Sequence, residues 1–64
     1  MLANEFKYEI TEDGVIESWI HPTGWIISNC DKDPEQWQCE LGDDIQEIPA
    51  STFEEALEWV NKNS

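Results

Sequence analysis

The stretch SWIHPTGWII, residues 18–27, constrains the fold more than any other part of this chain. Pro22-Thr23-Gly24 at its centre predicts a three-residue hairpin loop, because proline fixes φ at the first position and glycine can adopt the left-handed conformation at the last. Large apolar residues occupy both odd and even positions beside this loop. Since successive strand residues point to opposite faces, the hairpin must present apolar side chains on both faces of its sheet.

Alternating polarity predicts further strands on both sides of this hairpin. Asp13-Gly14 predicts a two-residue type I′ turn between the first two strands. A fourth strand is predicted at WQCEL, and a short edge strand before Pro49 would be a fifth. The sequence therefore predicts a four- or five-stranded antiparallel meander, with strands at 5–10, 15–21, 25–30, 37–41 and 45–48.

The segment STFEEALEWVNKNS predicts one C-terminal helix. Ser51 stands three residues before Glu54, as in a capping box, and Thr52 before Glu55 offers the same pattern one residue later. A single apolar stripe runs along this helix; it consists of Phe53, Ala56, Leu57 and Val60. We therefore expect one α+β domain, residues 1–64, with the helix packed on one face of the sheet.

The predicted pairings sort the strand residues into two faces. Tyr8 is expected opposite Trp19, Trp19 opposite Ile27, and Ile20 opposite Ile26. Face A then holds Phe6, Tyr8, Ile10, Val15, Trp19, His21, Trp25 and Ile27. Face B holds Lys7, Glu9, Ile16, Ser18, Ile20, Ile26, Ser28 and Cys30. We expect the helix on face A, because burying each large apolar side chain contributes about 1.5–3 kcal/mol.

The fourth strand can pair with the third in two registers. With Cys30 opposite Cys39, Trp37 would fall on face B. With Asn29 opposite Cys39, Trp37 joins face A and Ile27 faces Leu41. We favour the second register, in which the two cysteines point to opposite faces and cannot form a disulfide.

Face B suggests a function, because a single helix cannot cover both faces of the sheet. Ile16, Ile20 and Ile26 should form an exposed apolar cluster, and Trp25 after the hairpin loop should be partly exposed. Such clusters often mark interaction sites, so we expect these residues to bind a protein partner. A homodimer that packs face B on face B is the simplest form. Alternatively, the segment around Ile45 and Ile48 covers the cluster, or β-branched residues are there only as good strand formers.

Charge limits the partners that such a surface could bind. The chain has 15 Asp and Glu residues against 3 Lys, and its net charge is −12. It therefore lacks the basic residues that nucleic acid or an anionic membrane would require. The predicted acidic surface comprises Asp31, Asp33, Glu35, Asp43, Asp44, Glu54, Glu55 and Glu58. This surface could mimic the phosphates of a nucleic acid and inhibit a basic protein, or it could simply keep a small protein in solution.

Catalysis and metal binding find little support in the sequence. His21 is the only histidine, and a histidine at a strand end beside Trp25 is more often a packing residue. Asp31, Asp33 and Glu35 alternate as in a calcium loop, but the loop's required glycine and final glutamate are missing. Two cysteines and one histidine fall short of four zinc ligands. We therefore expect a non-enzymatic protein without catalytic residues, metal or cofactor.

Location and relatives are suggested by weaker features. MLANEFKYEI lacks the basic start and apolar run of a signal peptide, so a cytoplasmic protein with reduced cysteines is expected. Three strands followed by TFEEALEWV resemble the arm-type DNA-binding domains of phage integrases. Those domains turn basic strands toward DNA, whereas this sheet is acidic and apolar, so the resemblance implies topology alone. Size, acidity and aromatic content are also similar to those of phage-encoded host-modulating proteins, which implies a phage origin.

Overall fold

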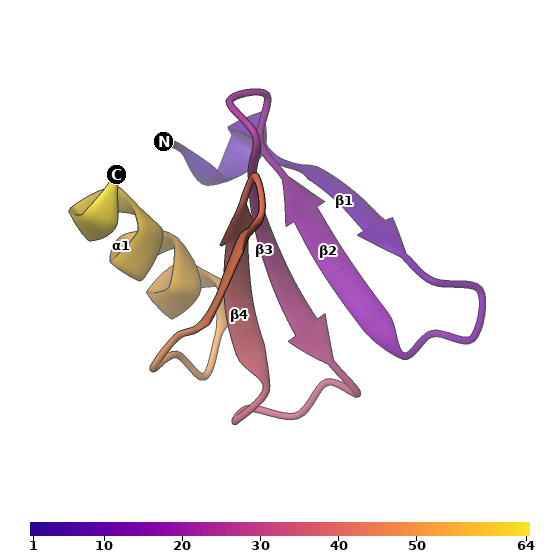
Figure 1. Ribbon diagram of the computed structural model, residues 1–64. Coiled ribbons are helices and arrows are strands. Elements are labelled where there is room, and N and C mark those ends of the chain that lie inside the picture. Colours follow the sequence, from indigo (N-terminus) through magenta and orange to yellow (C-terminus); the bar gives the residue numbers. More distant parts are fainter.

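The computed structural model describes residues 1–64 and contains one five-stranded antiparallel sheet and one C-terminal helix (Figure 1). The elements in chain order are η1 (Ala3–Glu5), β1 (Lys7–Ile10), β2 (Ile16–Ile20), β3 (Trp25–Cys30), β4 (Trp37–Leu41), β5 (Asp44–Glu47) and α1 (Phe53–Asn63). The strands lie in the sheet in sequence order. The predicted α+β meander is confirmed, including its fifth edge strand. No helix has the length and apolar character that crossing a membrane requires.

The central hairpin forms as its sequence predicts. The backbone N–H of His21 donates to the carbonyl of Trp25 over 2.8 Å and closes the three-residue loop. Gly24 adopts φ 106°, a left-handed conformation that other residues rarely reach. Trp19 lies opposite Ile27 and Ile20 opposite Ile26. The hairpin therefore carries large apolar residues on both faces.

The loop between β1 and β2 differs from the predicted turn. Tyr8 lies opposite Trp19 as expected, but the Thr11 N–H donates to the Ile16 carbonyl, so the loop contains the four residues 12–15. Gly14 alone has positive φ in this loop. The Asp13 carboxylate instead accepts hydrogen bonds from the Thr11 hydroxyl and the Val15 N–H. The prediction of a two-residue type I′ turn at Asp13-Gly14 is therefore wrong, because Asp13 stabilises the wider loop with its side chain.

A turn with positive φ at both central residues occurs between β3 and β4. Asp31 and Lys32 have φ 57° and 56°, and the Asp33 N–H donates to the Cys30 carbonyl over 3.0 Å. These are the features of a type I′ turn. The buried Asn29 amide holds the rest of the loop, since its Nδ2 donates to the carbonyls of Asp33 (2.7 Å) and Gln36 (3.2 Å).

The β3–β4 register is shifted by two residues from the favoured prediction. Cys39 lies opposite Ile27 and not opposite Asn29. The tight turn and the two Asn29 hydrogen bonds set this register, because they determine where β4 can begin. A shift of two preserves the alternation of faces, so Trp37 and Cys39 lie on face A as predicted. Cys30 and Cys39 are free thiols on opposite faces.

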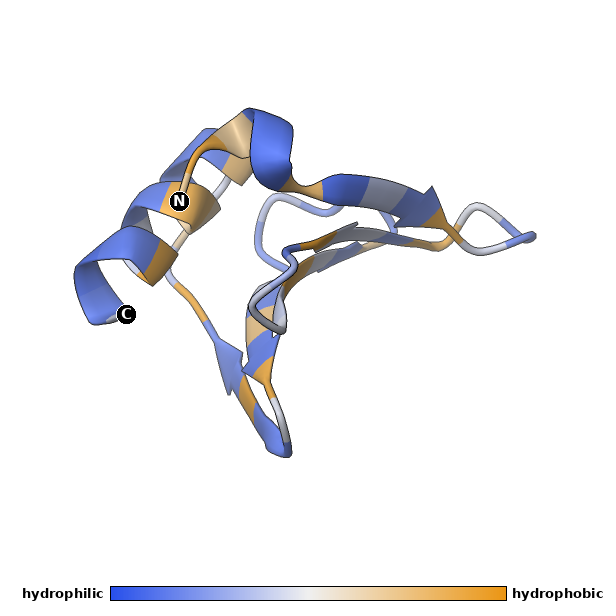
Figure 2. Cartoon of the chain, turned by 90° about the horizontal axis from the view of Figure 1, so that it is seen from above, coloured by the Kyte–Doolittle hydropathy of each residue, from blue (hydrophilic) through white to orange (hydrophobic).

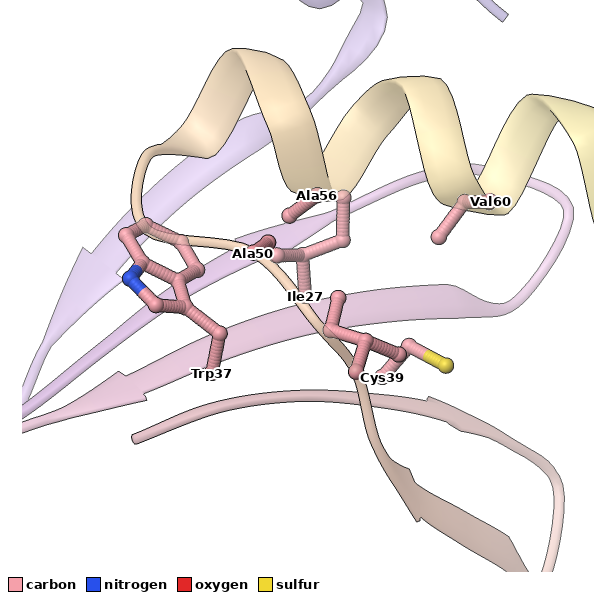
Figure 3. Close-up of a cluster of buried hydrophobic side chains, with 7 residues drawn as sticks. Ile27, Trp37, Cys39, Ala50, Ala56 and Val60 are labelled. Carbon is pink, nitrogen blue, oxygen red and sulfur yellow. The ribbon is translucent and has the colours of Figure 1, made fainter. Parts of the chain in front are cut away.

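The core forms where α1 packs on face A. Ala56 and Val60 of the helix lie over Ile27 and Cys39 of the sheet (Figure 3). After β5 the chain crosses to the same side, where Ile48 and Ala50 complete the buried cluster. The sheet bends strongly around α1, and η1 lies on the helix side as well (Figure 2). All of the buried packing therefore lies on one face of the sheet.

An aromatic stack extends this core toward β1. The rings of Trp19 and Trp37 stack with centroids 5.5 Å apart, and Phe53 lies 4.8 Å from Trp19. The indole N–H of Trp37 is buried without a hydrogen-bond partner. Stacking and apolar contacts therefore hold this ring in place.

Thr52 is the residue that caps α1. Its Oγ1 accepts a hydrogen bond from the Glu55 N–H over 3.2 Å. The Glu55 carboxylate accepts in turn from the backbone N–H of Ser51. Of the two capping patterns in the sequence, the Thr52 and Glu55 pattern is the one that forms.

We expect Thr52→Ala to lower the free energy of unfolding by about 1 kcal/mol, because the alanine side chain cannot accept the Glu55 hydrogen bond. Ser51→Ala is the matched control, since Ser51 contributes only its backbone N–H, which alanine retains. Urea unfolding followed by tryptophan fluorescence measures both. An equal loss in the two variants would contradict the assignment of Thr52 as the cap.

The turn at Lys32 leads to a second prediction. A residue with a Cβ is strained in the left-handed region, so Lys32→Gly should be about 1 kcal/mol more stable than Lys32→Ala. Both variants remove the same charge. At Glu12, where φ is not positive, Glu12→Gly should instead be less stable than Glu12→Ala, because glycine loses more chain entropy on folding. Urea unfolding of the four variants tests this, and equal stabilities at position 32 would contradict the turn geometry.

Candidate functional site

The candidate site is the face of the sheet that points away from α1. On β2 and β3, Ile20 lies opposite Ile26, and Ile16 lies opposite Cys30. The Ile16 side chain is 41% exposed, and Ile20 and Ile26 are half-buried. In Figure 2, α1 and η1 both lie on the opposite, concave side of the sheet. No helix of the chain therefore covers these isoleucines.

The segment around β5 extends this apolar surface and does not cover it. Ile48 is buried in the core on the helix side. Ile45 lies opposite Glu40, and Glu40 lies opposite Ile26, so Ile45 belongs to face B. It is 61% exposed. The alternative in which this segment folds over the isoleucines is therefore wrong. We call Ile16, Ile20, Ile26 and Ile45 together the isoleucine surface.

Ile45 is a site residue that the sequence reasoning missed. The signal was present in the dipeptide Gly42-Asp43, which forms a two-residue turn with Gly42 at φ 63°. This turn sets Leu41 opposite Asp44, and the next residue, Ile45, then falls on face B. Recognising this hairpin would have assigned Ile45 to its face.

Two open depressions flank Ile16 on face B. The larger, of about 250 Å³, is lined by Ile16, Ser28, Asn29, Cys30, Gln36 and Gln38. The smaller, of about 130 Å³, is lined by Glu9, Ile10, Thr11, Ile16 and Ser18. Ile16 borders both. The two depressions on either side of Ile16 can accept side chains from another protein, but they are too shallow to enclose a small molecule.

Cys30 contributes packing surface and not a nucleophile. Burial raises the pKa of its thiol, and the neighbouring Asp31 carboxylate raises the pKa further. A raised pKa keeps the thiol protonated at neutral pH, whereas the thiolate is the reactive form. Near Cys30, the Ser18 and Ser28 hydroxyls lie 3.4 Å apart, within hydrogen-bond distance. The centre of face B is therefore lined by small and weakly polar groups.

Trp25 does not belong to the isoleucine surface. It lies on face A opposite Leu41 and packs, half-buried, against the core. Its partial exposure agrees with the sequence analysis. The prediction that Trp25 belongs with Ile16, Ile20 and Ile26 is wrong, because strand alternation directs the Trp25 side chain to the other face of the sheet.

The eight residues of the predicted acidic surface lie in three separate places. Asp31, Asp33 and Glu35 lie in the β3–β4 loop, and Asp43 and Asp44 lie at the β4–β5 turn, at the other end of the sheet (Figure 1). The remaining three lie on α1; they are Glu54, Glu55 and Glu58. These carboxylates therefore surround the molecule and do not follow a single line.

One of the β3–β4 loop carboxylates, that of Asp33, has a structural role. Asp33 Oδ1 accepts a hydrogen bond from the Glu35 N–H over 2.9 Å and so fixes the loop. Nowhere do three or more His, Cys, Asp or Glu side chains converge in a way that could hold a metal ion.

His21 is a buried structural residue. The backbone N–H of Thr23 donates to its Nδ1 over 3.2 Å, which leaves the Nε2–H to donate to Glu5 Oε1 over 3.0 Å. The Phe6 ring packs 4.9 Å from the imidazole. Both ring nitrogens are therefore engaged, and they connect η1 to the β2–β3 loop. This arrangement is the packing role that the sequence analysis favoured.

The same contacts act on Glu5. Its carboxylate accepts a hydrogen bond from the Leu2 N–H over 2.9 Å as well as the one from His21. The Leu2 hydrogen bond, followed by that of His21, lowers the pKa of Glu5 below its ordinary value of 4.5. Glu5 therefore stabilises the fold most when it is ionised.

Comparison of the chain with protein-family models, curated proteins and solved structures gives no match. The function must therefore be argued from the surfaces of this chain.

The lowered pKa of Glu5 predicts how stability depends on pH. A carboxylate with a lowered folded-state pKa contributes stability above its unfolded pKa and loses it as the pH falls through the folded value. We expect Glu5→Gln to be less stable than wild type at pH 7, with a difference that shrinks below about pH 4. Glu12→Gln removes the same charge from an exposed loop and should show no such trend. Urea unfolding from pH 7 to below about pH 4 measures the difference in stability between wild type and Glu5→Gln. A difference that does not change with pH would contradict the role of Glu5.

Proposed function

We propose that this protein is a non-enzymatic interaction module whose isoleucine surface binds another protein. The bound protein would present an apolar centre bordered by Lys and Arg side chains. The observation that carries this proposal is the group of face B isoleucines that no element of this strongly acidic chain covers. Water-exposed isoleucines become favourable contacts when a partner removes them from water, at about 25 cal/mol per Å² of apolar area.

The polar residues of face B support a basic partner. Residues that lie opposite each other on successive strands form rows across the sheet. In one such row Glu40 lies between Ile26 and Ile45, and in the next row Glu9 and Glu47 are the two outermost residues. Lys7 is the single basic residue on this face. With a net charge of −12, the chain attracts a basic partner over long range and accelerates the encounter.

The same charges disfavour a homodimer that packs face B on face B. Each copy would bring Glu9, Glu40 and Glu47 into an interface in which Lys7 is the only basic residue of each face. Desolvated like charges at an interface cost several kcal/mol. A partner of opposite charge avoids this cost and uses the same isoleucines.

Inhibition by nucleic-acid mimicry is the second candidate. The net charge of −12 favours it, because carboxylates around a small body can occupy a groove that binds phosphates. Such binding would not need the isoleucine surface. The two candidates therefore differ in their dependence on Ile16 and Ile45.

The test uses a synthetic peptide with alternating Leu and Lys residues as the probe, titrated into ¹⁵N-labelled protein. We expect amide shifts concentrated at Ile16, Ile20 and Ile26. Replacing Ile16 and Ile45 together by Thr should weaken binding at least tenfold, because burial of two isoleucines is lost. Threonine keeps the β-branched shape that suits a strand.

Leu41→Thr is the matched control. Leu41 is 40% exposed, close to the 41% of Ile16, but it lies on face A. Binding by this variant should be unchanged, and a Leu–Glu peptide should not bind. Unchanged affinity in the isoleucine variant, combined with steep loss in salt, would favour the acidic mimic. No binding, or shifts confined to face A, would reject the isoleucine surface.

A further inference from the structure

The outer edge of β1 carries backbone groups that nothing in the chain pairs. β1 is an edge strand that pairs only with β2, and all four of its residues are exposed. η1 turns toward the α1 side and leaves this edge open (Figure 2). An open edge is a template for another strand unless its side chains oppose pairing.

The hydrogen-bond pattern identifies which residues face outward. The Thr11 N–H bonds to the Ile16 carbonyl, so these two residues form a closely bonded pair. Because such pairs alternate along an antiparallel ladder, Lys7 and Glu9 direct their backbone groups toward β2. Tyr8 and Ile10 direct theirs outward. Their side chains, on face A, are 48% and 47% exposed.

We propose that β1 pairs antiparallel with β1 of a second copy of this chain, with Tyr8 opposite Tyr8 of that copy. In this register Lys7 lies opposite Glu9 of the second copy, and Glu9 lies opposite its Lys7. Two cross-strand pairs of opposite charge result. Phe6 and Ile10 of the two copies lie opposite each other on face A. Each favourable cross-strand pair adds to the backbone hydrogen bonds.

Charge selects this register among those that the backbone permits. Outward-facing residues must lie opposite outward-facing residues, so Tyr8 can face either Tyr8 or Ile10 of the second copy. With Tyr8 opposite Ile10, Glu9 would face Glu9, which is unfavourable. Within one chain, Lys7 Nζ and Glu9 Oε1 form an exposed ion pair at 3.7 Å. Because an exposed ion pair contributes little stability, it can exchange for the two pairs across the interface.

The other edge of the sheet lacks this self-complementarity. β5 contains Asp44 and Glu47 and no basic residue, so its pairing with a second β5 offers no cross-strand pair of opposite charge. The β1 edge is therefore the one suited to a second copy.

The carboxylates of α1 lie away from the β1 edge. α1 packs over β3 and β4, and the molecule extends 30 × 24 × 22 Å. At physiological ionic strength the Debye length is about 8 Å, so carboxylates on α1 are screened from those of the second copy. Edge pairing joins the two sheets side by side and leaves both isoleucine surfaces open. It is therefore independent of the proposed function.

The test is a charge exchange between two variants, Lys7→Glu and Glu9→Lys. Each alone should dimerise at least tenfold more weakly than wild type, because both cross-strand pairs become repulsive. An equimolar mixture should restore dimerisation, since the introduced glutamate of one variant then faces the introduced lysine of the other, and the native Lys7 faces the native Glu9. The double variant Lys7→Glu/Glu9→Lys should associate like wild type. Sedimentation equilibrium over a concentration series measures all of these samples.

The outcomes separate edge pairing from other modes of association. General charge repulsion predicts that Glu9→Lys, with net charge −10 in place of −12, associates more strongly than wild type, which is the opposite result. Slower amide exchange at Tyr8 and Ile10 with rising protein concentration would support the edge. A wild-type protein that stays monomeric at millimolar concentration would overturn the proposal. A mixture whose mass is no larger than that of its components would also overturn it. So would dimerisation abolished by Ile45→Glu alone, because Ile45 lies on face B at the other edge of the sheet.

Discussion

The packing of α1 against Ile27 and Cys39 is the interaction on which the rest of the structure depends. A chain of 64 residues has room for a single helix over a five-stranded sheet. Once that helix occupies face A, no other helix of the chain covers the isoleucines of face B. The core and the candidate binding surface are therefore two results of one constraint, which is the presence of apolar residues on both sides of β2 and β3.

Much of the architecture could be predicted because it follows from local sequence rules. The Pro22-Thr23-Gly24 loop sets the pairing of β2 with β3, and strand alternation then assigns Ile16, Ile20 and Ile26 to one face. The helix position follows from the aromatic content of face A. Even with the wrong register for β4, Cys39 fell on the correct face, because the error was an even number of residues.

The details that escaped prediction depend on side chains that bind the backbone. Asp13 could form a tight turn with Gly14, but its carboxylate bonds to Thr11 and Val15 and supports a wider loop. Asn29 holds two carbonyls of the β3–β4 loop, and this three-dimensional contact leaves no periodic signal in the sequence. Trp25 was grouped with the isoleucines for its exposure, although its strand position assigns it to the other face.

Because the two thiols lie on opposite faces of the sheet, their labelling rates can report how often α1 separates from the sheet. Cys39 is sealed beneath α1, whereas Cys30 is only half-buried at the edge of an open depression. An alkylating reagent reaches Cys39 only in molecules whose helix has lifted. Cys30 is accessible in the intact fold, and at a pH high enough to ionise its thiol it reacts without helix movement. The ratio of the two labelling rates thus reports how often the helix leaves the sheet, and Cys30 serves as the reference within the same molecule.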